Sequence, residues 1–335
     1  MSPSLESAWT RLLAEAGRAA RVLPRSARRV MPANGQPRAE SNRGNDLPLE
    51  RPVPLPPGLD LPSIEAIFRS YAVNAEPEGH MDAYVQDSFW RFLHTWSLVR
   101  HERGDCLEIG ANPYFTTLLL DEYTDLGLTL TNYYGETTSK TATETLRYRD
   151  TSGEAHEKAF TSHLVNVERD RFPFEDDAFD VVLFCEVIEH LLMDPLAALR
   201  EITRVLRSGG RLVVTTPNVN RLQNVVGITA GMNIYDPYSG YGPYGRHNRE
   251  YNRDELTRLL EFAGFDVELA FTADAHPSAA HLDPRYEDLV PLVRFREHDL
   301  GHYLFISARP TRPPREGLPA FLYRSWPPEV IVEDV

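Results

Sequence analysis

Two patterns of hydrophobic and polar positions alternate along the chain, one typical of buried strands and the other of amphipathic helices. From residue 105 onward, short and nearly continuous apolar runs alternate with segments in which apolar residues recur every three or four positions. The runs predict five strands, at 106–109, 126–131, 164–167, 179–185 and 211–216. The periodic segments predict helices at 116–120, 195–206 and 254–262, and a closing pair of strands is expected at 267–271 and 303–307. The alternation predicts an α/β fold, a doubly wound and mostly parallel seven-stranded sheet with helices on both faces.

The chain before and after this region has a different character. Residues 1–30 combine helical spacing with many arginines, which predicts a basic amphipathic arm that either lies on an anionic membrane surface or stays solvated. Residues 31–62 are rich in proline and predict an extended linker. We expect N-terminal helices that cap the functional end of the sheet at 63–103, the α/β domain at 104–309 and a C-terminal tail at 310–335.

Composition and charge narrow the class of partner. The 335 residues are 42% hydrophobic and carry a net charge of −14, which disfavours nucleic acid because binding a phosphate backbone depends on basic residues. Cys106 and Cys185 both fall in predicted strands, so we expect two buried thiols in a reducing compartment. No cysteine–histidine cluster predicts a metal, no apolar run approaches the ~20 residues that span a bilayer, and no secretory signal stands out. These features predict a cytoplasmic protein.

The turn after the first strand reads Glu108-Ile109-Gly110-Ala111-Asn112. Gly110 lets the backbone turn tightly and allows a ligand to come close. Only one of the three glycines of a dinucleotide-binding turn is present, and a diphosphate needs such a cradle of N–H groups. A nicotinamide-dependent dehydrogenase is therefore disfavoured, and a nucleoside ligand without phosphate fits better.

Further motifs follow in a fixed order. They are Pro173-Phe174, Phe179-Asp180, Glu186-Val187-Ile188-Glu189-His190, the run from Glu201 through Arg204-Val205-Leu206 to Gly209-Gly210, and Thr216-Pro217-Asn218. With Glu108-Ile109-Gly110, this ordered set resembles the class I S-adenosylmethionine (SAM)-dependent methyltransferases, specifically the methyltransferase 11/23-type group, over about residues 104–308. The resemblance implies SAM as the cofactor and leaves the methyl acceptor open.

The resemblance also implies which residues hold the cofactor. Glu108, Gly110, Ala111 and the adjoining Asn112 would contact the methionine part of SAM, Asn132 its ribose, and Asn166 with Val167 its adenine, while Cys185 and Glu186 would line the site past the fourth strand. Asn132 has an alternative role, as a turn asparagine before Gly135, because an amide can hydrogen-bond the main chain as well as a hydroxyl.

A tyrosine-rich loop at 232–251 follows the fifth strand, and it looks like an insertion found in methyltransferases of glycan and cell-surface biosynthesis. The candidate acceptor-binding residues in it are Tyr235, Tyr241, Tyr244, Arg246 and Arg249. Tyrosines stack on sugar faces and hydrogen-bond hydroxyls, and arginines bind acidic groups. The alternative is a rigid surface loop packed by its own aromatics.

Transfer of a methyl group to a hydroxyl calls for a proton acceptor, and His190 and His247 are the candidate catalytic residues. His190 could instead cap a helix. His247 lies between Arg246 and Arg249, which predicts a lowered pKa and a neutral base.

The sequence therefore predicts a SAM-dependent methyltransferase that O-methylates a saccharide or a lipid-linked glycan intermediate. One alternative is methylation of a small quinone-like or lipid metabolite, and another is a non-catalytic scaffold with the same fold. The expected partner is a small-molecule or glycan acceptor, with peripheral membrane contact through the arm as the further option.

Overall fold

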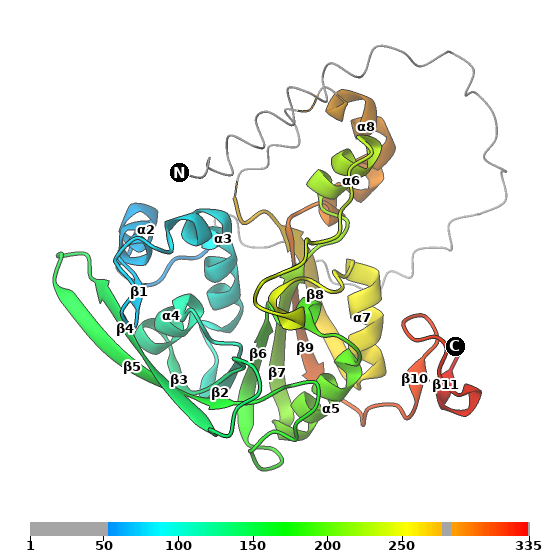
Figure 1. Ribbon diagram of the computed structural model, residues 1–335, viewed down its shortest axis with the longest axis horizontal. Coiled ribbons are helices and arrows are strands. Elements are labelled where there is room, and N and C mark those ends of the chain that lie inside the picture. Colours follow the sequence, from blue (N-terminus) through cyan, green and yellow to red (C-terminus); the bar gives the residue numbers. More distant parts are fainter. Residues whose placement is uncertain (1–52, 277–282, 284, 334–335) are drawn as a thin grey trace.

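The computed structural model describes residues 53–276, 283 and 285–333 (Figure 1). The arm expected at 1–30 and most of the linker expected at 31–62 lie outside these residues. One large sheet organises the described chain. Its strands are β1 (Ala72–Val73), β2 (Arg103–Ile109), β3 (Asp125–Asn132), β4 (Thr141–Arg149), β5 (Ala155–Leu164), β6 (Phe179–Cys185), β7 (Leu206–Pro217), β8 (Phe265–Ala273) and β9 (Tyr303–Pro310).

The strand order is β1-β4-β5-β3-β2-β6-β7-β9-β8. The central strands from β5 to β7 are parallel, and β9 runs antiparallel between β7 and β8. The chain winds outward from β2 through β3 to one side and from β6 through β7 to the other. The predicted doubly wound sheet is thereby confirmed, and β4 and β1 extend it from seven strands to nine.

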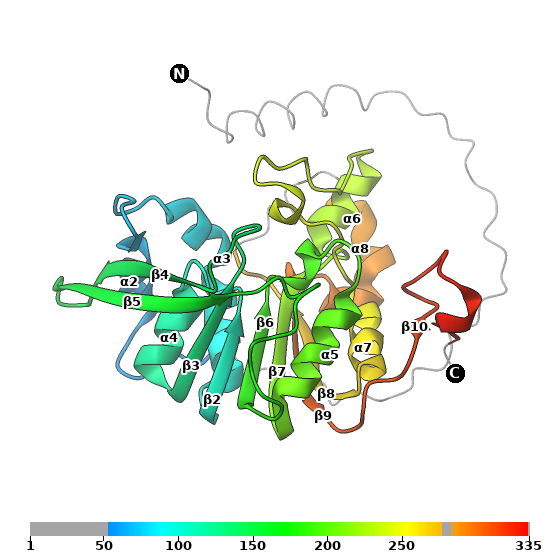
Figure 2. The ribbon, with the colours of Figure 1, turned by 60° about the horizontal axis from the view of Figure 1, so that its bottom comes forward.

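Helices cover both faces of the sheet, as the alternation of strands and helices requires (Figure 2). The helices α2 (Leu61–Arg69), α3 (Asp82–Val99) and α4 (Phe115–Tyr123) belong to one layer, and α5 (Pro195–Val205) and α7 (Arg253–Phe262) belong to the other. Successive side chains of β6 point to opposite faces of the sheet. Val181 and Leu183 pack in the core with α3 and α4, whereas Val182 and Phe184 pack in the core with α5 and α7.

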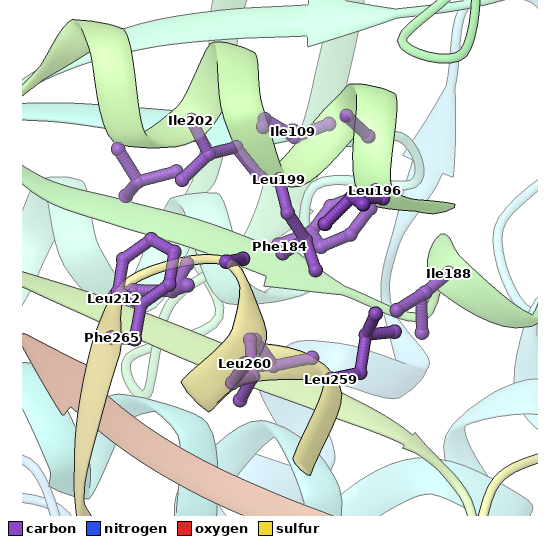
Figure 3. Close-up of a cluster of buried hydrophobic side chains, with 14 of the residues drawn as sticks. Ile109, Phe184, Ile188, Leu196, Leu199, Ile202, Leu212, Leu259, Leu260 and Phe265 are labelled. Carbon is purple, nitrogen blue, oxygen red and sulfur yellow. The ribbon is translucent and has the colours of Figure 1, made fainter. Parts of the chain in front are cut away.

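Figure 3 shows the second of these cores. Leu199 and Ile202 of α5 and Leu259 of α7 lie around the fully buried Phe184. Strands buried on both faces carry nearly continuous apolar residues, and Asp180 is the one charged residue of β6, which explains why the bounds of this strand could be predicted from the sequence.

One predicted strand is misplaced. The strand expected at 164–167 is β5, which ends at Leu164 and pairs with β3 through its last three residues. The rest of β5 forms a hairpin with β4 that projects beyond the helices (Figure 1). Its residues are mostly exposed or half-buried, so the hairpin lacks the apolar run that marks a covered strand.

The tail expected at 310–335 packs against the domain over its described residues. Leu318 and Tyr323 are buried in the α5–α7 core, and the Tyr323 hydroxyl donates to Oδ1 of Asp194 at 2.6 Å, the residue that caps α5. Two short strands, β10 (Leu318–Pro319) and β11 (Ile331–Val332), close this segment. Among the residues described, none of the helices has the length and apolarity that a membrane crossing demands.

Candidate functional site

A cavity opens at the carboxyl ends of the parallel strands, where the winding reverses between β2 and β6. Open α/β sheets bind their ligands at this position. We call it the strand-end cavity. Five predicted cofactor residues line it, namely Gly110, Asn132, Asn166, Val167 and Glu186. The sequence did not single out the other strand-end residues in the lining, which are Ile109, Thr131, Tyr133, Val165, Val187 and Leu191. They are apolar or uncharged residues that only the topology brings together.

Gly110 shapes the floor of the strand-end cavity. Its φ of 75° lies in the left-handed region that favours glycine, and its N–H donates to the carbonyl of Thr131 at 2.9 Å. A Cβ at this position would lie 2.6 Å from Cγ2 of Val187, another lining residue. The glycine therefore keeps open a space that any side chain would narrow.

Glu108 does not line the cavity. Its side chain is buried and accepts a hydrogen bond from the Thr117 hydroxyl at 2.7 Å, which ties β2 to α4. Burial raises the pKa of Glu108 to about 8. Ala111, Asn112 and Cys185 also lie outside the lining, and both cysteines of the chain are free thiols.

The side chain of Asn132 is engaged by the protein on both of its polar atoms. Its Oδ1 accepts the N–H of Asn112 at 2.9 Å, and its Nδ2 lies 3.1 Å from the hydroxyls of both Tyr114 and Ser162. Tyr114 is fully buried, and its hydroxyl donates to Glu144 of the β4–β5 hairpin at 2.6 Å. These contacts connect Asn132 to the turn after β2 and not to the turn at Gly135, and Tyr114 lies outside the cavity lining.

Tyr244, expected to contact the acceptor, lines the strand-end cavity instead. Its hydroxyl donates to Oε2 of Glu168 at 3.0 Å and lies 3.4 Å from Nδ2 of Asn166. Glu168 also accepts the N–H of Asp194 at 2.6 Å. Tyr244 thus connects the loop at 232–251 to the adenine side expected from the sequence.

Helix α3 contacts Glu186 of the cavity lining through a charged residue that the sequence did not single out. Arg91 is almost fully buried and lies 3.9 Å from Oε1 of Glu186, which also accepts the Thr215 hydroxyl at 2.8 Å. The Arg91 guanidinium donates to the Tyr84 hydroxyl at 2.7 Å. Arg91 interrupts the apolar stripe of α3, so its burial depends on a partner that lies far away in sequence.

A second concavity lies in the tyrosine-rich loop, and we call it the loop cavity. Its lining consists of Asn233, Tyr235, Asp236, Pro237, Tyr238, Arg246, His247 and Asn248. His190 lines the strand-end cavity, and its ring lies 5.0 Å from that of His247 between centroids. The two histidines predicted as catalytic residues therefore meet where the two cavities adjoin.

Hydrogen bonds fix both imidazole rings. Nδ1 of His190 lies 3.0 Å from the carbonyl oxygen of Arg246, and Nδ1 of His247 lies 3.1 Å from Oε1 of Glu250. The main-chain N–H of His247 donates to Oδ2 of Asp236 at 3.0 Å. In the described part of the chain these bonds leave Nε2 of His247 for another partner, and Nε2 of His190 lies 3.9 Å from Oε1 of Glu189.

The predicted effect of the arginines on His247 is wrong. Arg246 lies over the Tyr238 ring at 4.8 Å, and Arg249 pairs with Glu255, so both guanidinium groups are engaged elsewhere. Burial lowers the pKa of His247, but the hydrogen bond that its ring donates to Glu250 and the charges of the nearby carboxylates outweigh burial, and the pKa is raised. Burial, with the neighbouring His247, lowers the pKa of His190.

Glu189, which precedes His190 in the motif after the fourth predicted strand, completes this group. Its side chain is fully buried, and Oε2 accepts the Thr216 hydroxyl at 2.9 Å. Among the described residues, none donates a hydrogen bond to its Oε1. Its carbonyl oxygen accepts the N–H of Asn248 at 2.7 Å, which fastens the loop to the turn after β6.

Comparisons with known proteins point to one family. A family model described as a methyltransferase domain matches residues 80–270, more than half of the chain. A protein named "Probable S-adenosylmethionine-dependent methyltransferase" from Mycolicibacterium smegmatis is 39% identical over 114 residues, which cover 34% of this chain and 39% of that protein. A Mycobacterium tuberculosis protein similarly named is 39% identical over 115 residues, 34% of this chain and 36% of that protein. These matches span well under half the length of either relative.

Among solved structures, a SAM-dependent methyltransferase from Archaeoglobus fulgidus is similar with a TM-score of 0.44 and 14% identity. That similarity covers 69% of this chain and 99% of the other.

Proposed function

Because the chain belongs to the methyltransferase domain family, whose named relatives are SAM-dependent, we propose that it transfers the methyl group of SAM to a hydroxyl of a saccharide or lipid-linked glycan intermediate. One observation carries the proposal. A cavity at the ends of the parallel strands and a polar cavity in the tyrosine-rich loop adjoin at His190 and His247. A donor in the first and an acceptor in the second would have their reacting atoms at this junction.

The strand-end cavity suits SAM better than a dinucleotide. Gly110 leaves space for a ligand to approach the main chain closely, and a Cβ would occupy that space. No second glycine follows it in the turn to help cradle a diphosphate. When bound, SAM supplies a methyl carbon on a sulfonium, which an acceptor oxygen attacks as the carbon–sulfur bond breaks to leave S-adenosylhomocysteine. Gly110, Asn166, Val167 and Glu186 are the residues that we propose to contact it, with Asn132 holding the turn.

The loop cavity favours a hydroxylated acceptor. Asp236, Arg246 and Asn248 line it beside Tyr235, which is 80% exposed. An apolar quinone or lipid would need a mostly apolar lining, whereas exposed tyrosine rings and hydrogen-bonding groups suit a sugar. Tyr241 belongs to the same loop, is 95% exposed and offers a further stacking surface.

Methyl transfer depends mainly on alignment, because the sulfonium is already a good leaving group. The acceptor hydroxyl must also lose its proton as the bond forms. The structure leaves Nε2 of His247 for this task, since Nδ1 is occupied by Glu250. His247 is therefore the side chain that we expect to decide turnover.

The test uses two histidine variants of the full chain. His247→Ala should lose turnover against a panel of saccharides and glycolipids, measured by methyl transfer from labelled SAM, and should keep its SAM affinity in calorimetry. His156→Ala, on the projecting hairpin, is the matched control and should keep both. Unchanged turnover in His247→Ala would remove His247 from the reaction. Absence of heat with both SAM and S-adenosylhomocysteine in the wild type would support a scaffold instead.

A further inference from the structure

We propose that Glu189, His190 and His247 together bind one divalent metal cation at the junction of the strand-end and loop cavities. The proposal rests on the proposed methyl transfer and deepens it, since this cation would hold the acceptor oxygen and would replace His247 as the group that promotes loss of the hydroxyl proton. The three side chains each offer one ligand atom, and these atoms all lie within 4.8 Å of one another. Nε2 of His190 lies 3.9 Å from Oε1 of Glu189.

These separations are close to those of a ligated ion. Ligand atoms about 2.1 Å from a tetrahedral cation lie about 3.4 Å apart. The side chains of His190 and His247 are each 28% exposed, so neither ring is fully enclosed, and a shift of about 1 Å or less between the ligand atoms would close the remaining gap.

An unsatisfied oxygen gives independent support. Oε1 of Glu189 is buried and accepts no hydrogen bond from the described residues, while Oε2 is held by Thr216. A buried polar atom without a partner is costly, and native proteins rarely retain one without a functional reason. A cation beside His190 would supply the missing partner.

The outer contacts of both histidines are those of metal ligands. A ligating imidazole typically donates its other N–H to a carboxylate or a main-chain carbonyl, which fixes the tautomer and aims the free nitrogen at the metal. Nδ1 of His247 has the Glu250 carboxylate, and Nδ1 of His190 has the carbonyl of Arg246. Glu250 is itself paired with Arg221, so this outer contact is held in place.

Two imidazoles and one carboxylate form a donor set for a divalent transition metal, with positions left open for further ligands. His190 lines the strand-end cavity and His247 lines the loop cavity. An acceptor oxygen in the loop cavity can therefore occupy an open coordination position of the cation. A bound cation lowers the pKa of such a hydroxyl, whose proton would leave to water in the loop cavity.

A second group of potential ligands, Asp150, Glu154 and His156, lies on the β4–β5 hairpin. There the histidine Nε2 is already 2.9 Å from Asp150, whose other oxygen accepts the N–H of Ser152. This group has no unsatisfied buried oxygen among its described atoms, so it carries no proposal, and it serves as the control.

The experiment titrates metal-free full-length protein with Co²⁺, whose visible absorption reports ligand number, in the absence of acceptor. The wild type and His156→Ala should each bind one equivalent with a spectrum typical of nitrogen and oxygen ligands. Glu189→Gln keeps the acceptor for Thr216, and both it and His247→Ala should lose this spectrum. Glu250→Gln should weaken Co²⁺ binding by about 10- to 100-fold, as outer contacts do.

Two results would overturn the proposal: no Co²⁺ spectrum in the wild type, or a spectrum lost only in His156→Ala. In either case His247 would act as a direct proton acceptor. Calorimetry with SAM on the same samples separates the two claims. If the wild type binds SAM but not Co²⁺, the metal site alone is refuted. If the wild type does not bind SAM, the proposed function is refuted.

Discussion

The strand-end and loop cavities adjoin but are built by different means. The strand-end cavity is formed where β2, β3, β5 and β6 end, so the ladder hydrogen bonds of the sheet set the positions of its lining residues. The loop cavity belongs to a segment whose regular structure is one short 3₁₀ turn, Pro243–Gly245, and a few polar contacts attach that segment to the turn after β6. Binding in the first cavity should therefore depend on main-chain geometry, and catalysis in the second on individual side chains.

The largest effect should come from a substitution that alters the main chain of the strand-end cavity. Gly110→Ala forces a left-handed conformation, which costs roughly 1–2 kcal/mol, and displaces Val187 into the cavity. We expect the Kd for SAM to rise by about 100-fold or more, equivalent to about 2.7 kcal/mol, as measured by calorimetry.

The control for this change is Gly153→Ala in the turn of the β4–β5 hairpin. Gly153 has a φ of 85°, and a Cβ there would meet no atom within 4 Å. The variant should lose a similar amount of stability in thermal unfolding and keep its SAM affinity. Equal SAM binding by the two variants would show that the space around Gly110 does not govern SAM binding.

In the loop cavity, the next largest effect is expected from Asn248→Ala. The Asn248 amide donates to the carbonyls of His190 at 2.9 Å and Pro243 at 2.8 Å, and so positions the loop over the histidine pair. Misplacement by about 1 Å can cost on the order of 100-fold in rate, so we expect kcat to fall by about 10- to 100-fold with SAM affinity retained. Steady-state kinetics at saturating SAM is the measurement.

Asn233→Ala is the matched change in the same loop. Asn233 also lines the loop cavity, but its side chain only accepts the N–H of Tyr235 at 3.0 Å and does not reach the turn after β6. Its kcat should stay close to that of the wild type. A fall in SAM affinity for Asn248→Ala would mean that the two cavities are not independent.

The contrast between main-chain geometry and individual side-chain contacts also explains which parts of the structure could be predicted from the sequence. Motif residues of the sheet have structural roles that depend on contacts within and beside the sheet. Arg204 donates to the carbonyl of Phe174 at 2.9 Å and pairs with Glu201 at 2.7 Å, and Asp180 accepts the N–H of Asp105 at 2.8 Å. The fold and much of the strand-end cavity were therefore predictable from ordered motifs and apolar runs.

The contacts of the loop cavity were not predictable in the same way. Neighbours in sequence suggested that Arg246 and Arg249 would lower the pKa of His247, whereas the hydrogen bond to Glu250 and the charge of the distant Glu189 raise it. Arg91, 95 residues before Glu186, could not be placed beside it from helical spacing. Contacts between side chains of separate elements depend on topology, which periodicity alone does not contain.

The smallest effect on SAM binding is expected for Glu108, which the motif resemblance placed against SAM. In the structure its side chain instead accepts the hydroxyl of Thr117 in α4. Because burial raises the pKa of Glu108 to about 8, the folded state keeps its proton between about pH 4.5 and 8, while the unfolded state loses it. Wild-type stability should thus fall as pH rises through this range. Glu108→Gln cannot ionise, so its advantage in urea unfolding should grow by up to about 1.4 kcal/mol per pH unit, with SAM affinity unchanged. A pH-independent difference would mean that Glu108 is ionised in the folded protein, and a loss of SAM affinity would return it to the strand-end cavity.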